Sequence, residues 1–380
     1  MIKFKKKSDF SITKFIIITF LIFILFDVLA GKYIYKKFIR KNYKDVDRSY
    51  IIADPIYHHK LQSHFQGLVG WGYLSYRFCT DVNGFRTSCN EIILPSKLSS
   101  PVNKFDIGII GNSFTEGAGY IYEKSFVSLI NSKLKDKKIA NLAVLTYSPS
   151  IYYAKINSLL SEGYKFDEII VFLDLGNIVD DILCYQLENE IIVTRETIPI
   201  CQGGEPSTIK NEIRNFTSTK LRLTYEFYSQ IKYKLIEFGI LEYKGRDTSI
   251  NNIRSNWTYA YEAKNYNNYT YDESVENILA NMRKLSKLLK ENDIDLSVAV
   301  YPWPATLKND IEENKYLKIW QDFCIANCKN FFNLMEPFFD LLENEKFSNV
   351  YKKYYIYEDV HFNGEGHKFI AESFLKLYKN

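Results

Sequence analysis

From Phe105 onward, short apolar runs alternate with longer amphipathic stretches, and this alternation constrains the fold more than any other feature of the chain. The runs FDIGIIG, KIANLAV, DEIIVFLDL, DLSVAVYPW and YYIYEDVH predict strands. The stretches SFVSLINSKLKDKK, SIYYAKINSLLSEGY and SVENILANMRKLSKLLKEN predict helices between them. Continuous apolar strands that alternate with helices indicate a parallel sheet covered on both faces. We therefore expect an α/β domain of three α/β/α layers over residues 104–380.

The alternation lapses between about residues 184 and 271, where the chain is rich in Tyr, Asn and Arg and has turn signals at Gly203 and Gly204. We interpret this stretch as a cap-like insertion over one edge of the sheet. Residues 32–103 contain few strong elements and are expected to form a linker with one β-hairpin.

The N-terminus has an apolar run over residues 15–26, followed by Asp27 and four further apolar or small residues, with lysines on both sides. Counted through Asp27, the whole stretch reaches roughly the lower length limit for a helix that crosses a membrane. Residues 1–31 are therefore predicted to be a cytoplasmic tail and a transmembrane anchor. There are two alternatives. The segment could be a cleaved signal peptide, since Val28, Leu29 and Ala30 loosely fit a cleavage site, or it could be a buried core helix. The flanking charges do not decide the orientation of the helix.

The six cysteines fall into three local pairs, which suits an oxidising compartment, so the body of the protein is expected outside the cytoplasm, periplasmic or extracellular. The pairs are Cys79 with Cys89, Cys184 with Cys201, and Cys324 with Cys328, of which Cys184–Cys201 at least is expected to be oxidised. Cys324 and Cys328 could instead be two unrelated buried thiols. No histidine accompanies the pairs, so no metal site is predicted.

The segment YRFCTDVNGFRTSCN has Asn83 and Gly84 between alternating residues, which is a strong hairpin signal. A two-residue turn would pair Cys79 with Ser88 and leave Cys89 one residue out of register. A disulfide between Cys79 and Cys89 would need a bulge or a three-residue loop.

The net charge of +4 over 380 residues, without a basic stripe, gives no support for a nucleic-acid partner. A phosphate-binding loop is excluded because no Lys-Ser/Thr follows the glycines after Ser113. We expect no cofactor.

Three polar residues are predicted to follow strands and so to meet at the carboxyl edge of the sheet: Ser113, Asn177 and His361. A serine hydroxyl becomes a good nucleophile when a histidine takes its proton and a carboxylate holds the other imidazole nitrogen. Glu358 and Asp359 both precede His361. Taken alone, Ser113 could simply cap a helix, and His361 could be a structural histidine.

Two motifs resemble blocks of the SGNH/GDSL hydrolases. GNSFTEG looks like their first block, and DVHFNGEGHKFIAE is similar to their last. The resemblance covers residues 104–183 and 271–380 and implies a flavodoxin-like α/β/α fold. It also implies that Ser113 is the nucleophile and His361 the general base. Asp359 would orient His361, because the two-residue spacing is similar to that of alginate acetyltransferase-like members; a three-residue spacing, common elsewhere in the family, would select Glu358.

The resemblance further implies an oxyanion hole made of the Ser113 and Thr146 backbone N–H groups and the Asn177 side chain. Thr146 stands where the family has a glycine, and Asn177 follows Gly176 directly instead of the usual Gly-x-Asn-Asp. Asn112 replaces the usual aspartate beside the nucleophile, which we interpret as a tolerated hydrogen-bonding substitution. His367 is expected to belong to the start of the last helix.

Trp303, in the strand end YPWPATL, could stack on a sugar ring as a substrate-binding residue, or could be an aromatic plug held by Pro302 and Pro304. The resemblance implies acyl transfer through a serine ester, without metal or nucleotide. The predicted function is a membrane-anchored esterase or O-acetyltransferase acting on acyl, mainly acetyl, esters of a cell-surface polysaccharide. The alternative is a catalytically silent SGNH domain that binds glycans or serves assembly.

Overall fold

The computed structural model describes residues 12–35, 37, 49–71, 74–90, 103–195, 213, 216–217, 219–237, 240–241, 254–259, 265–266, 269–356 and 359–379. The chain divides into two compact units. One consists of Met1–Lys44 and Gly203–Tyr243, and the other consists of Asp45–Gln202 and Lys244–Asn380.

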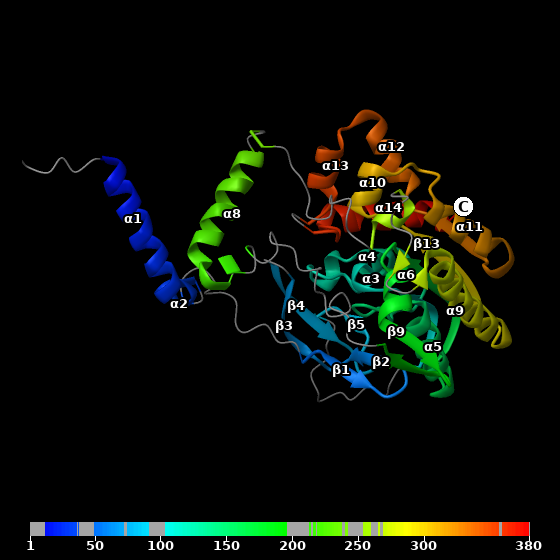
Figure 1. Cartoon of the computed structure of the whole chain (residues 1–380). Helices are drawn as coiled ribbons and strands as arrows, with labels where there is room; N and C mark the ends of the chain where they lie inside the picture. The colour runs from blue at the N-terminus through cyan, green and yellow to red at the C-terminus, as the bar shows by residue number, and fades with distance from the viewer. Residues whose placement is uncertain are drawn as a thin grey trace, which may run out of the picture. The chain divides into compact units, whose positions relative to one another are not determined.

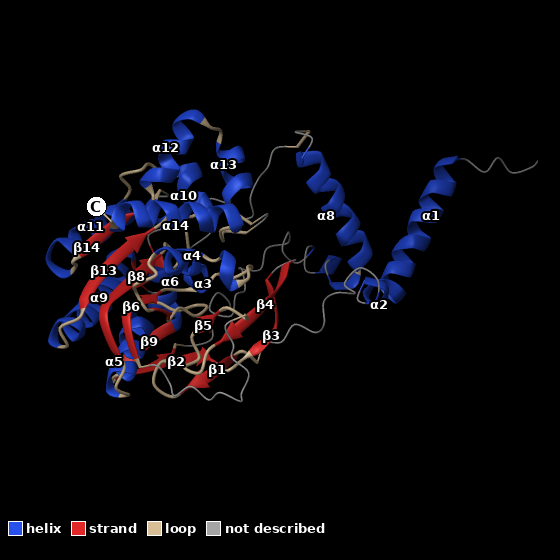
Figure 2. Ribbon diagram, turned by 180° about the vertical axis from the view of Figure 1, so that it is seen from behind, coloured by secondary structure: helices blue, strands red, loops and turns tan. Residues whose placement is uncertain are grey.

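The larger unit is built on a five-stranded parallel sheet with the strand order β14-β13-β8-β6-β7 (Figures 1 and 2). Counted along the chain this is the order 2-1-3-4-5 of flavodoxin-like folds. The predicted parallel sheet is confirmed. Its strands are β6 (Lys104–Ile110), β7 (Ile139–Asn141), β8 (Lys165–Leu173), β13 (Asp295–Val300) and β14 (Asn330–Asn333).

Helices form the two outer layers. In one layer α4 packs against α14, and in the other α9 contacts both α5 and α11. The predicted helices after Ser125, Ser150 and Ser274 correspond to α4, α5 and α9. The helical segments of this unit include α3 (Ser113–Glu116), η3 (Tyr122–Lys124), α4 (Phe126–Lys133), α5 (Pro149–Ser161), α6 (Asn177–Val179), η4 (Asp180–Cys184), α9 (Tyr271–Glu291), α10 (Pro304–Asn309), α11 (Lys315–Asn327), α12 (Glu336–Asn344), α13 (Phe347–Tyr354) and α14 (Gly364–Tyr378).

The fifth strand is not the one that the sequence predicted. It is the short run β14, whereas the segment YYIYEDVH begins in α13 and then makes a tight loop. In that loop Ile356 N donates to His361 O and Asp359 N donates to Ile356 O. Among the described residues of the segment, only the bridge between Tyr355 and Phe362 is of the β type. The chain therefore turns back on itself, and the strand interpretation of this segment is wrong.

Two small sheets precede the central one in the same unit. One pairs β1 (Ile51–Asp54) with β2 (His58–Leu61), and the other has the order β3-β4-β5. The strands of the second are β3 (Gln66–Trp71), β4 (Leu74–Thr80) and β5 (Arg86–Thr87).

The β4–β5 hairpin differs from the simple two-residue turn. Cys79 pairs with Thr87, not with Ser88, and Asp81 N donates to Phe85 O. The loop between these residues is three residues long and has Gly84 at φ +76°, a left-handed conformation that glycine adopts without strain. This is the three-residue alternative, and Cys79 and Cys89 form a disulfide.

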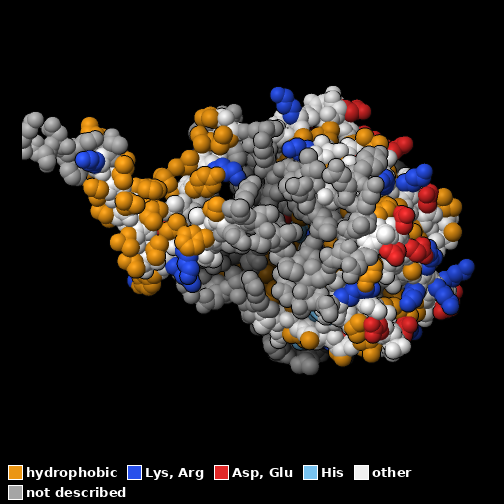
Figure 3. Space-filling model, in the orientation of Figure 1, with side chains coloured by type: hydrophobic (Ala, Val, Ile, Leu, Met, Phe, Trp, Pro, Cys, Tyr) orange, Lys and Arg blue, Asp and Glu red, His pale blue; other side chains and the backbone are white. Residues whose placement is uncertain are grey.

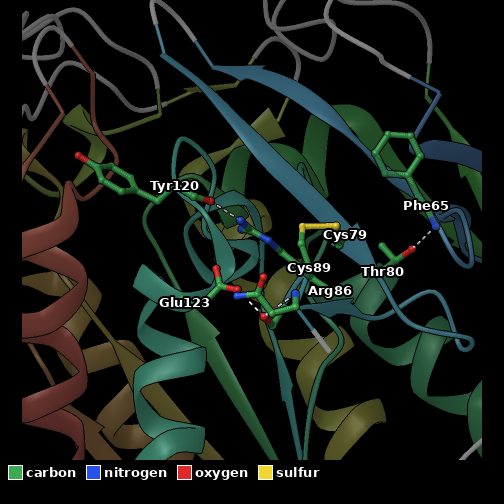
Figure 4. Close-up of a disulfide and its surroundings, with 9 residues drawn as sticks. Phe65, Cys79, Thr80, Arg86, Cys89, Tyr120 and Glu123 are labelled. Atoms are coloured by element: carbon green, nitrogen blue, oxygen red, sulfur yellow. Dashed lines mark hydrogen bonds between the residues drawn. A yellow bond between two sulfur atoms is a disulfide. The ribbon is translucent and has the colours of Figure 1, made fainter. Parts of the chain in front are cut away.

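Figure 4 shows this disulfide beside Arg86, a buried residue of the hairpin. The Arg86 guanidinium donates to the carbonyl oxygens of Glu116 and Tyr120, which lie at and beyond the end of α3. Arg86 therefore ties the hairpin to the helix that begins at Ser113.

Cys324 and Cys328 also form a disulfide, so they are not two separate thiols. Cys184 is disulfide-bonded, and Cys201, its expected partner, lies outside the described residues. Of the expected insertion, the hairpin β9 (Tyr185–Glu188) and β10 (Ile191–Thr194) packs on α5. The η6 turn (Asn256–Thr258) and the pair β11 (Asn265–Tyr266) and β12 (Tyr269–Thr270) belong to the same unit.

The smaller unit contains α1 (Ile12–Phe26), the π-helical segment η1 (Asp27–Gly31), α2 (Lys32–Ile34) and α8 (Arg222–Glu237). Residues Lys14–Ile34 form a helix long and apolar enough to cross a membrane, although a signal sequence has the same properties. Its apolar side chains are mostly exposed.

Candidate active site

Ser113 stands where the chain passes from β6 into α3. Asn112 is the N-cap of this helix, and its Oδ1 accepts a hydrogen bond from Phe114 N (3.2 Å). Ser113 is therefore not the capping residue, and its hydroxyl is available for another partner. Gly111 is required just before this turn, because a Cβ there would lie 2.2 Å from Thr115 Oγ1.

The hydroxyl of Ser113 meets His361, which is 248 residues away in the sequence. Ser113 Oγ lies 2.7 Å from His361 Nε2. On the other side of the ring, His361 Nδ1 lies 2.6 Å from Asp359 Oδ1, which also accepts the His361 backbone N–H (3.0 Å). The structure thus brings together Ser113, His361 and Asp359 in a continuous chain of hydrogen bonds. Glu358, the alternative carboxylate, lies outside the described residues.

A third donor reaches Asp359 from β3: Trp71 Nε1 donates to Asp359 Oδ2 at 3.0 Å. Burial raises the pKa of Asp359, but the charge of His361 and the hydrogen bonds from His361 and Trp71 lower it, so that it lies below its usual value. Asp359 is held as a carboxylate that can stabilise a protonated imidazole.

Two aromatic rings hold the imidazole. Phe114 stacks on His361 with ring centroids 4.2 Å apart and an interplanar angle of 26°. Trp71 meets it edge-on, at 4.7 Å and 73°. Phe114 follows the proposed nucleophile directly, but Trp71 belongs to the segment that the sequence suggested was a linker. No local sequence pattern around Trp71 predicts its contact with Asp359, which is 288 positions away.

The loop that contains Thr146 is held from two sides. Glu116 Oε2 accepts from Leu145 N (2.6 Å), and Leu145 O lies 2.8 Å from His59 Nε2. Thr146 itself has φ +62°, a left-handed conformation that is rare for a β-branched residue. This explains why a glycine would suit the position. The conformation is kept although the residue is Thr.

The Ser113 and Thr146 backbone N–H groups both lack an acceptor within the described part of the chain. Unpaired backbone N–H groups of this kind are what an oxyanion hole requires. Asn177 differs, because its Nδ2 donates to Tyr147 O (3.1 Å) and to Tyr152 OH (3.3 Å). Both hydrogens of this buried amide are engaged, so its expected oxyanion role stays a prediction that requires a change of partners.

Asn112 and Asp174 form a buried pair beside the site. Asn112 Nδ2 donates to Asp174 Oδ2 at 2.6 Å, and Gly176 N donates to Asp174 Oδ1. Burial raises the pKa of Asp174, and the Asn112 bond opposes this effect. A carboxylate at position 112 would face the Asp174 carboxylate, which gives a physical reason for asparagine there.

Trp303 is only 5% exposed, and its ring lies 6.1 Å from that of Phe114. A sugar platform needs an exposed ring face, so the packing fits the aromatic-plug interpretation. His367 lies in the first turn of α14, as expected, and burial lowers its pKa to about 3.

No family model matches the chain, and no curated protein matches it. The chain is, however, similar to solved structures of other proteins. A lipolytic protein of the G-D-S-L family from Desulfitobacterium hafniense has 10% identity and a TM-score of 0.36, over 73% of this chain and 99% of its own. An acetylxylan esterase from Geobacillus stearothermophilus has 11% identity and a TM-score of 0.38, over 72% and 93%. The esterase EstA from Pseudoalteromonas sp. has 10% identity and a TM-score of 0.35, over 73% and 97%.

Proposed function

We propose that the protein is an SGNH/GDSL-type serine esterase or O-acyltransferase. The observation that carries the proposal is the unbroken hydrogen-bond chain from Ser113 through His361 to Asp359. These residue types in this order activate a hydroxyl for attack on an ester carbonyl. The two sequence motifs that resemble the family's first and last blocks contain all three residues.

In the proposed reaction Ser113 Oγ attacks the carbonyl carbon of an acyl ester, and His361 Nε2 takes the hydroxyl proton. Asp359 stabilises the imidazolium that forms. The negative charge on the former carbonyl oxygen is received by the Ser113 and Thr146 backbone N–H groups. His361 then returns the proton to the leaving alcohol as the C–O bond breaks, which leaves an acyl-serine. A water molecule or a sugar hydroxyl, deprotonated by His361, releases the acyl group.

Trp71 and Phe114 act as positioning residues in this scheme. The stacked and edge-on rings restrict rotation of the imidazole, and the Trp71 N–H fixes the second oxygen of Asp359. This arrangement keeps His361 Nδ1 protonated and Nε2 free to accept the serine proton.

We further propose that the catalytic unit is anchored in a membrane by the N-terminal helix and lies outside the cytoplasm. The candidate span Lys14–Ile34 and the Cys79–Cys89 and Cys324–Cys328 disulfides support this location. A surface glycan that carries acetyl esters is the proposed substrate, and the similarity of the motif spacing to alginate acetyltransferase-like proteins supports it.

The test of the enzyme proposal is covalent labelling. A fluorophosphonate probe should add one mass equivalent, mapped to Ser113 by peptide mass spectrometry, and Ser113→Ala should abolish both labelling and turnover of p-nitrophenyl acetate. A wild-type protein that is folded but never labelled would instead be a silent glycan-binding module.

The acceptor is tested separately by incubating the protein with an acetyl donor and with acetylated and deacetylated oligosaccharides. Acetyl groups that appear on sugar identify a transferase, whereas acetylated glycans that are only stripped identify an esterase.

A further inference from the structure

The carboxylate of Asp27 is the one charged group of the described residues between Lys14 and Lys32, and α8 covers it. Leu223 N donates to Asp27 Oδ1 at 2.9 Å, and Thr224 N donates to Oδ2 at 2.7 Å. Asp27 is fully buried, whereas its neighbours Phe26 and Val28 are about half exposed. Gly31 leaves room for this carboxylate, since a Cβ there would lie 1.8 Å from Asp27 Oδ1.

Asp27 therefore caps a helix that begins 195 positions later in the chain. The first-turn N–H groups of a helix have no intrahelical acceptor, and the positive end of the helix dipole favours a negative charge there. Arg222 adds a second contact, because its guanidinium lies 4.0 Å above the Tyr35 ring and donates to Tyr35 OH (2.7 Å). Both contacts lie within the smaller unit and join α8 to the η1–α2 end of the apolar helix.

The capping contact also removes an electrostatic problem. An ionised carboxylate within a membrane span is costly, and such groups are found paired or hydrogen-bonded inside a protein. Two charge-assisted backbone hydrogen bonds satisfy Asp27 without a basic side chain. If residues 14–34 cross the bilayer, the start of α8 must then lie at the depth of Asp27.

α8 has an apolar face suited to that position. Phe227, Tyr228 and Ile231 lie within one sector of the helix and are 67%, 62% and 43% exposed. Figure 3 shows hydrophobic side chains gathered on the exposed surface of the smaller unit, over both α1 and α8. Residues 219–237 contain four basic and two acidic side chains, a balance that favours anionic lipid headgroups.

We propose that α8 is a second membrane-contacting element: an amphipathic helix whose apolar face enters the bilayer interface and whose start is fixed to the membrane-spanning helix by Asp27. The occupant of its exposed face is lipid, because α8 belongs to the same unit as the apolar helix α1 and its first turn is hydrogen-bonded to Asp27, which directly follows α1. This role is independent of the esterase proposal.

The test uses the full-length protein in phosphatidylcholine vesicles that contain phosphatidylglycerol and a lipid with a photoactivatable acyl chain. After irradiation, peptide mass spectrometry should find lipid adducts in α1 and in residues 222–237, and none in α9, which serves as the soluble control. Adducts in α1 without adducts in α8 would overturn the proposal, since another protein surface or water would then cover the α8 face. Absence of adducts from both helices would overturn it as well.

Three variants separate the apolar face from the cap. The double variant Phe227→Ser with Ile231→Ser should lower α8 labelling several-fold and leave α1 labelling unchanged. Asp27→Leu, which keeps the helix apolar, should also lower α8 labelling, because α8 loses its two capping hydrogen bonds and keeps only the Arg222–Tyr35 contact; Asp27→Asn, which keeps one acceptor, should give a value between Asp27→Leu and wild type. Unchanged α8 labelling in Asp27→Leu would refute the role of Asp27. Thermal unfolding by circular dichroism confirms that each variant is folded.

Discussion

Replacing Asp359 by Asn is a sharp test of the triad because the carboxylate is surrounded only by donors. Its Oδ1 accepts two N–H groups of His361, and its Oδ2 accepts Trp71 Nε1–H. The amide of an asparagine has only one oxygen, so it can accept hydrogen bonds from His361 or from Trp71 but not from both. With the oxygen towards His361, the amide NH₂ faces the Trp71 N–H. With the amide reversed, NH₂ faces His361 and stabilises the tautomer that cannot accept the serine proton.

The size of the effect follows from these two orientations. In the first orientation, the Trp71 donor is left unsatisfied in a partly buried site, which costs about 1–2 kcal/mol, and the imidazolium loses its negative partner. In the second, the general base is lost. When a triad aspartate is replaced by asparagine, the histidine takes the wrong tautomer and kcat falls by about 10⁴-fold. We expect kcat/KM for p-nitrophenyl acetate to fall by about 10²–10⁴-fold.

The sharper prediction concerns the double variant with Trp71→Phe. Removing the indole N–H removes the conflict, so the oxygen of the introduced amide can stay on His361 and the correct tautomer is favoured. Relief of about 1.4 kcal/mol corresponds to about a tenfold recovery of kcat/KM over the single Asp359→Asn variant. Trp71→Phe alone should lower kcat/KM by less than about tenfold, since Oδ1 keeps both of its His361 contacts.

The assay is initial-rate kinetics on the three variants, with circular dichroism to confirm folding and Glu358→Gln as the matched control. The control should stay within about twofold of wild type. If the double variant is no more active than Asp359→Asn, then Trp71 does not act through Asp359. If Glu358→Gln is the damaging change, the assignment of the carboxylate is wrong.

Three further predictions concern stability. Burial raises the pKa of Glu116 to about 7 from the usual 4.5, so the native state keeps a proton that the unfolded state loses, and stability falls as pH rises from about 4.5 to 7. Urea unfolding should show wild type losing stability relative to Glu116→Gln by up to about 1.4 kcal/mol per pH unit in this range, and a pH-independent difference would contradict the assignment. Replacing Cys79 and Cys89 together by Ser opens a short loop and should cost about 2–3 kcal/mol in urea unfolding; a cost near zero would argue against the disulfide. Asp181→Ala should cost about 3–5 kcal/mol in the same assay, because Asp181 accepts hydrogen bonds from Ser148, Ser150 and Asn281 in a fully buried site, and a cost below about 1 kcal/mol would refute this role.

The sequence could predict those parts of the fold that rest on local periodicity. The strands β6, β8 and β13 are continuous apolar runs, and the capping, glycine and helix signals around them are local as well. It failed at β14, which has four residues, and at the loop before His361, whose aromatic and β-branched residues fit a strand. In that loop tertiary packing determines the conformation, because Tyr351 OH is hydrogen-bonded to the backbone of Asp359 and keeps the segment folded back.

The pairing of Ser113 with His361 was predictable for a different reason: the two residues lie in short motifs that resemble the first and last blocks of one family. Their partners were not. The amide of Asn177 is engaged by Tyr147 and Tyr152, a choice that depends on how α5 packs and not on the residues next to Asn177. Likewise, the pairing of Asn112 with Asp174 joins two strand ends that are 62 residues apart.

Trp71 shows most clearly what local patterns leave out, and it changes how the first part of the chain is understood. The residue lies at the end of β3, whose partner β4 continues into the hairpin closed by Cys79–Cys89 and tied to α3 through Arg86. One end of this small sheet therefore supports α3, the helix that begins at Ser113, and the other supplies a donor to the carboxylate of Asp359. Because the segment bonds both the end of α3 and the Asp359 carboxylate, we expect it to restrain the distance between Ser113 and His361, so changes in β3 or in the hairpin should act on kcat more than on KM.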